Sequence, residues 1–193
     1  MTEKTDADIN KMAQSITQSV QENWGWFLGL GILLLLIGMF AIAAPLASTL
    51  AVTIVLAAAL VIGGIFQIIH AFKVQKWSGF IWQLIVGLIA VVGGIIIYTN
   101  PVAGALTLTL LVAAIFFVQG ISQVILGFRI RPHDGWGWML ASGVISAVAG
   151  LAIWGEFPIS GAWALGMLAG IAILFNGWSY IAIALAAKAS RNN

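Results

Sequence analysis

The sequence predicts an all-α integral membrane protein with six transmembrane helices, built from three parallel two-helix hairpin repeats. Three observations predict it, and the first is composition. Hydrophobic residues make up 62% of the 193 residues and charged residues only 7%, which is more apolar surface than a soluble core of this size can bury. The second is the distribution of charge along the chain, and the third is an internal repeat with a nearly constant period.

All eight basic residues lie in four short stretches that are separated by three long apolar blocks: Lys4, Lys11, Lys73, Lys76, Arg129, Arg131, Lys188 and Arg191. Each block is long enough for two helices of about 20 residues, the length that crosses a bilayer core. Because cytoplasmic loops collect Lys and Arg, we expect both termini and both basic loops in the cytoplasm. The blocks contain a single charged residue, Glu156, at the opposite face.

The elements follow in order along this pattern. Residues 1–23 are expected to form a polar cytoplasmic tail, either an amphipathic helix on the membrane surface, as the helical spacing of its apolar residues indicates, or a partly disordered segment. The six-helix transmembrane domain is expected over 24–189, followed by a short tail over 190–193. The expected spans are 25–44, 48–70, 79–98, 103–127, 136–155 and 161–187. Pro45, Pro101 and Pro158 are expected in the outer turns, since proline cannot continue a helix. Tryptophans beside the basic stretches are expected to anchor at the headgroup level: Trp24, Trp26, Trp77, Trp136 and Trp138.

The repeats are expected over about 24–73, 77–131 and 136–189. Two series of glycines recur at the same step from one repeat to the next: Gly31, Gly87 and Gly143, and also Gly38, Gly94 and Gly150. Positions seven apart share one helix face, so each first helix carries a flat stripe. Lipid gives helices no hydrophobic drive to associate, so they meet where small residues allow close backbone contact. We expect these stripes to pack against neighbouring helices, within one bundle or between copies of the chain.

Uncharged polar residues occupy corresponding places in the second helices: Gln67, Gln119, Gln123, Asn176 and Tyr180. Two interpretations stay open for this candidate polar cluster. Interhelical hydrogen bonds are the ordinary use of an amide side chain in lipid. A polar ring around a pseudo-threefold axis would instead line a small pore or pocket.

Titratable groups are scarce within the spans. His70, near the cytoplasmic end of the second span, is a candidate pH-sensitive group or a tolerated interfacial residue. Glu156 is expected to be solvated at the outer edge, with cation binding or gating as the alternative. We expect no catalytic centre, cofactor or metal site, because the chain has no cysteine, two histidines and no paired carboxylates. Nucleic-acid binding is not expected, since the basic residues come in pairs and form no patch.

The repeat unit resembles the short repeat of the HdeD family of small bacterial inner-membrane proteins associated with acid resistance. The motif appears as Gly31, Gly38, Pro45, Gly64, Gln67, Phe72 and Lys73, and again as Gly87, Gly94, Pro101, Gly120, Gln123, Phe128 and Arg129. The third copy departs from it, with Tyr180 at the glutamine position and Ala186 at the basic position. The resemblance implies six spans, a bacterial inner membrane and protection in acid, with no catalytic residues.

Two classes of function follow from the sequence. The first is a membrane-resident stress protein that acts through lipid or through a membrane-protein or homo-oligomeric partner, without catalysis. The second is a small channel or permease whose path is lined by Gln67, Gln123, Asn176 and Tyr180. The scarcity of charge within the spans favours the first.

Overall fold

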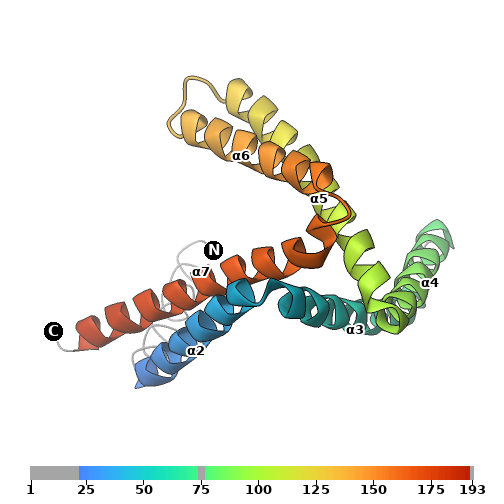
Figure 1. The fold of residues 1–193 in the computed structure, drawn as a ribbon, viewed down its shortest axis with the longest axis horizontal. Coiled ribbons are helices and arrows are strands. Elements are labelled where there is room, and N and C mark those ends of the chain that lie inside the picture. Colours follow the sequence, from blue (N-terminus) through green and yellow to red (C-terminus); the bar gives the residue numbers. More distant parts are fainter. Residues whose placement is uncertain (1–21, 74–76, 192–193) are drawn as a thin grey trace, which may run out of the picture. The chain divides into compact units, whose positions relative to one another are not determined.

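The computed structural model describes residues 22–73 and 77–191 (Figure 1). Within these ranges the chain is helical, without strands, and all six helices are long and apolar enough to cross a membrane. Their bounds are α2 Trp24–Ala43, α3 Pro45–Ala71, α4 Trp77–Thr99, α5 Pro101–Arg129, α6 Trp136–Gly155 and α7 Ser160–Arg191. The amphipathic helix expected in the N-terminal tail lies outside the described residues.

The prolines act as helix starts more than as turn residues. Pro45 and Pro101 are the first residues of α3 and α5, a position where the missing N–H costs nothing and the fixed φ suits the helix. These two proline turns therefore shrink to one residue each, Ala44 and Asn100. The third proline turn is longer, because residues 156–159, with Pro158, lie between α6 and α7.

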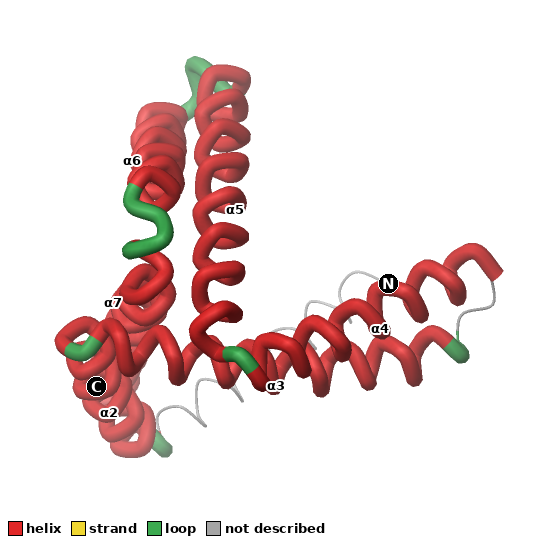
Figure 2. Tube along the Cα trace, turned by 45° about the vertical axis from the view of Figure 1, so that its right-hand side comes forward, coloured by secondary structure: helices red, strands yellow, loops and turns green. Residues whose placement is uncertain are grey.

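The helices form two compact units, each described by itself. The first unit contains α2 and the part of α7 from Leu168 onward, and the second unit runs from Ala44 to Met167. In the first unit α2 and α7 lie side by side and antiparallel (Figure 1). In the second unit α3 pairs with α4 and α5 pairs with α6 (Figure 2). Smaller contacts join α5 to α3 and to α4.

Within the second unit, the close pairs run across the basic loops and not across the proline turn. The expected hairpin of α4 and α5 makes only a small contact, near the turn, where Gly104 lies against Ile97. The connection length gives the reason. Antiparallel helix pairs usually need a loop of about 2–5 residues, and Asn100 alone cannot separate two packed axes. The basic loops 72–76 and 130–135 are long enough.

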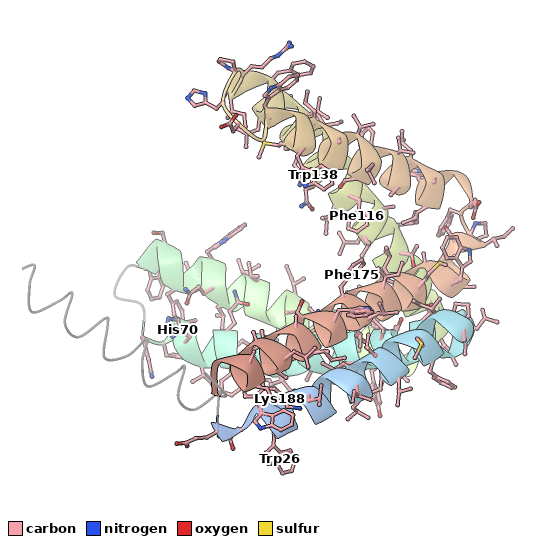
Figure 3. The ribbon with its side chains drawn as sticks, turned by 90° about the vertical axis from the view of Figure 1, so that its left-hand side faces the viewer. Trp26, His70, Phe116, Trp138, Phe175 and Lys188 are labelled. Atoms are coloured by element: carbon pink, nitrogen blue, oxygen red, sulfur yellow. The ribbon has the colours of Figure 1, made fainter. Side chains whose placement is uncertain are left out.

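Small side chains fill the interior of each pair, and large ones point away from it. The buried apolar residues are mainly alanines, such as Ala57, Ala113 and Ala184. Most large side chains are exposed, including Phe40 and Phe175. Figure 3 shows many side chains projecting from the helix surfaces. Such an inverted distribution suits helices that meet through small residues while lipid covers the rest.

Candidate functional site

The glycine stripes lie at the centre of the close pairs. In the α3–α4 pair, a Cβ added at Gly87 would lie 3.0 Å from the carbonyl oxygen of Gly64. A Cβ at Gly94 would lie 2.8 Å from the carbonyl oxygen of Ala57. Both glycines are buried. Real Cβ atoms are essentially absent below 3.0 Å from other atoms, so the contact at Gly94 requires glycine, and the contact at Gly87 is tighter than nine in ten real Cβ contacts.

The same contacts recur in the other two pairs. In α5–α6, Cβ atoms at Gly143 and Gly150 would lie 2.9 Å from Gly120 O and 2.7 Å from Ala113 O. In α2–α7, Cβ atoms at Gly31 and Gly38 would lie 3.0 Å from Gly177 O and 2.9 Å from Gly170 O. The α3–α4 and α5–α6 pairs therefore join the second helix of one repeat to the first helix of the next. In the α2–α7 pair, the second helix of the third repeat packs against the first helix of the first repeat.

One residue of the candidate polar cluster forms a bond between helices. The Ser142 hydroxyl on α6 donates its one hydrogen toward two acceptors, Oε1 of Gln123 on α5 and the carbonyl oxygen of Met139, each 3.0 Å away. Gln119, one turn earlier on α5, is exposed. Gln123 is thus paired across its helix pair, and Gln119 is directed away from it.

The other members of this cluster are satisfied locally or lie at helix surfaces. Asn176 is exposed and donates to Ala172 O on its own helix at 2.8 Å. Tyr180 stacks on Phe27 of α2, with ring centroids 6.2 Å apart. Gln67 on α3 is half-buried. Sequence reasoning missed Gln83 on α4, whose buried Oε1 has no hydrogen-bond partner.

The two candidate titratable residues are exposed. His70 lies in the last turn of α3, where its backbone carbonyl accepts from the N–H of Lys73. Glu156 ends α6, and its N–H donates to Ala152 O. Neither side chain lies in a buried polar setting.

Buried hydroxyls mark a feature that sequence reasoning did not predict. In the second unit, the first turns of α3, α5 and α7 meet around a cavity of about 160 Å³. Leu46, Thr49, Leu50, Val102, Ala105, Leu106, Gly161 and Ala162 line it. The backbone N–H of Gly166 donates to Oγ1 of Thr49 at 3.0 Å. Thr109 is 1% exposed, and its hydroxyl has no partner.

The repeat period could have found these hydroxyls. Thr53, Thr109 and Gly166 stand at the same position of the three successive repeats. A position that stays polar or small in every repeat, inside an apolar helix, indicates a contact with other helices. The resulting cavity is apolar apart from Thr49.

Basic and aromatic side chains meet at two places where a basic stretch adjoins a helix start, which we call the basic corners. The Arg131 guanidinium lies 4.1 Å from the ring centroid of Trp136 in the α5–α6 pair. The Lys188 ammonium lies 4.7 Å from the ring centroid of Trp24 in the α2–α7 pair. A cation over an aromatic face is attracted by the ring quadrupole. Each basic corner therefore holds a positive charge in a defined place.

No group of three or more His, Cys, Asp or Glu side chains that could hold a metal ion occurs in the part of the chain that the structure describes. Among the described residues, the features that bear on function are helix packing, the cavity beside Thr49 and the two basic corners.

Comparison with known proteins identifies the repeat. The family model of the short repeat of unknown function (DUF308) matches twice, over residues 29–99 and 85–154. The two matches together cover more than half of the chain. No curated protein and no solved structure was found to match it.

Proposed function

This chain belongs to the family of the short repeat of unknown function (DUF308), and from that premise we propose that it acts through contacts with lipid or with a membrane partner, without catalysis. It does so as a multi-pass protein of a bacterial inner membrane, in a stress response. The resemblance of its repeats to the HdeD family supports acid as the stress. The six apolar helices support the membrane setting.

Both termini lie in the cytoplasm in this proposal. The pairing of Lys188 with Trp24 supports it, because it joins the end of α7 to the start of α2. The two ends of an antiparallel pair of spans belong on one face of the membrane. The basic residues Lys73, Arg129 and Arg131, near the connections within the two close pairs of the second unit, favour the cytoplasm for that face.

One observation supports contact over conduction most strongly: two polar residues that would line such a path, Gln123 and Asn176, already have hydrogen-bond partners within the helices. Gln123 accepts from Ser142 across its pair, and Asn176 donates to its own helix. The cavity between the first turns of α3, α5 and α7 is lined by apolar side chains apart from Thr49. An ion path needs polar or charged groups to replace the hydration shell of the ion.

Acid tolerance of the outer face is a consequence of this topology. Acid denaturation proceeds when carboxylates that are ionised in the native state become protonated. The outer turns carry one carboxylate, Glu156, and it is exposed. We propose that the outer face stays folded at low external pH because it has almost nothing to titrate.

Flux of protons and ions into liposomes that contain the purified full chain tests the proposal. With an imposed pH gradient between pH 4 and 7, we expect the same leak as in empty liposomes. Gln67→Leu/Gln123→Leu should give that leak as well. Flux above the empty liposomes that this double substitution abolishes would establish the alternative, a channel lined by Gln67, Gln123, Asn176 and Tyr180.

A further inference from the structure

The two basic corners occupy equivalent places in the repeat. Arg131 and Lys188 stand at the same position of the second and third repeats, once the insertion near Glu156 is counted. Trp24 and Trp136 stand at the same position of the first and third repeats. In both pairs a cation in the last turns of a second helix or just after it lies over the tryptophan that starts a first helix. The same contact is thus built twice from different parts of the chain.

Each basic corner presents two tryptophans in different settings. Trp24 and Trp136, beneath the cations, are half-buried. Trp26 and Trp138, two residues further on, are 82% and 83% exposed, and Figure 3 shows both side chains projecting away from their helices. An exposed indole beside a membrane-spanning segment belongs at the headgroup level. In the proposed topology the cation of each corner lies close to the depth of the lipid phosphates.

Both cations keep their hydrogen-bond donors available. Arg131 and Lys188 are exposed, and no ion pair joins either of them to a carboxylate in residues 22–73 or 77–191. A guanidinium stacked on a ring uses its face, so the N–H groups along its edge stay free for the oxygens of a phosphate. An ammonium over a ring likewise keeps donors for a second partner.

We propose that each basic corner binds the headgroup phosphate of an anionic phospholipid of the cytoplasmic leaflet. The inference rests on the proposed membrane topology and names the lipid class that the protein contacts. The ring fixes the cation, and the exposed tryptophan packs beside the glycerol region of the same lipid. Basic side chains next to a span attract anionic headgroups, and charge complementarity selects these over zwitterionic ones.

The third pair provides an internal comparison. Phe80 of α4 stands at the position of the second repeat where the other two repeats have Trp24 and Trp136. Its ring contacts Phe72 at 5.5 Å and Trp77 at 5.6 Å, measured between centroids, in place of a cation. The residues that the structure describes therefore form two such lipid sites, one in α5–α6 and one in α2–α7.

Native mass spectrometry of the full chain in detergent, titrated with phosphatidylglycerol or with phosphatidylcholine of the same acyl chains, tests the proposal. We expect two phosphatidylglycerol molecules to bind more tightly than the rest, and phosphatidylcholine to show no such pair. Arg131→Gln and Lys188→Gln should each weaken one site by about fivefold. Arg131→Lys and Lys188→Arg should retain both sites, which separates charge from folding.

Arg129→Gln and Lys73→Gln are the matched controls, since each removes one exposed charge of the same kind. They should change binding by less than about twofold, because a cation that does not touch the headgroup is screened at physiological salt. Equal weakening by controls and corner variants would overturn the proposal, and so would displacement of the lipid by millimolar inorganic phosphate. Liposome flux is a separate readout, so a conducting protein that keeps these two sites would contradict only the proposed function.

Discussion

The Ser142 hydroxyl on α6 donates a 3.0 Å hydrogen bond to Oε1 of Gln123 on α5. It joins the two helices of one close pair toward the ends that the basic loop connects. A glutamine that recurs with the repeat could have lined a path through the membrane. Its bond to a neighbouring helix instead gives it a packing role, and the strength of that bond can be measured.

Removal of this bond should lower stability modestly. Interhelical hydrogen bonds in membranes contribute about 0.6 kcal/mol on average, so Gln123→Leu and Ser142→Ala should each destabilise the protein by about that amount. A double-mutant cycle in a detergent unfolding titration measures the coupling. Gln119→Leu, at an exposed position of the same helix, should have no coupling to Ser142→Ala. Additive effects of the first two substitutions would contradict the bond.

The effect of a glycine-to-alanine substitution on stability should depend strongly on which glycine of α4 is replaced. Gly87→Ala places a methyl against the backbone of Gly64, and overpacking of this kind costs about 1–3 kcal/mol. Gly93→Ala is the matched control, because a Cβ there meets nothing within 4 Å, so helix propensity should leave stability unchanged or raised. Thermal unfolding in detergent compares the two. Equal losses at both positions would mean that α4 does not pack through this face.

Replacement of a buried threonine by valine should change the stability of the protein differently at Thr49 and at Thr109. Thr49→Val removes the acceptor of the Gly166 N–H and should destabilise the protein by about 1 kcal/mol. Thr109→Val replaces a buried hydroxyl without a partner by an isosteric methyl and should be neutral or stabilising. Chemical unfolding of both variants measures the difference. A loss at Thr109 as large as the loss at Thr49 would indicate a hidden partner for Thr109.

Topology can be measured directly, because the chain has no cysteine. Glu22→Cys places a thiol just before α2, and Ala189→Cys places one near the end of α7. Ile159→Cys places a thiol in the third proline turn. An impermeant maleimide should label the first two in inverted vesicles only and Ile159→Cys in intact cells only. Labelling of Glu22→Cys and Ala189→Cys from opposite sides would contradict the pairing of α2 with α7.

The sequence predicted the helices well, because lipid requires every span to be apolar and to satisfy its own backbone. The repeat period also identified Gly31, Gly87 and Gly143, the glycines that lie in the pair contacts. The repeat period could not predict which helix each glycine contacts, because a glycine stripe can pack against any helix face made of small residues. The partner depends on the matching positions Gly64, Gly120 and Gly177 and on the length of each turn.

The candidate site was harder to predict for the same reason. An amide side chain in a span indicates a hydrogen bond but not its partner. Gln123 bonds to a neighbouring helix, Asn176 bonds within its own helix, and Gln83 Oε1 has no partner. Helix rotation and the neighbour decide which occurs, and neither is encoded in residue type. The contact of Arg131 with Trp136 likewise depends on how the loop 130–135 closes.

Crosslinking across the α2–α7 pair tests the central claim, that the third repeat closes onto the first. Phe27 and Tyr180 stack with centroids 6.2 Å apart, so Phe27→Cys/Tyr180→Cys should crosslink within one chain through a short bis-maleimide in native membranes. Phe27→Cys/Ser179→Cys should not, because Ser179 is exposed on another face and bonds to Phe175 O of its own helix. Equal crosslinking of the two variants, or crosslinks only between chains, would contradict this closure.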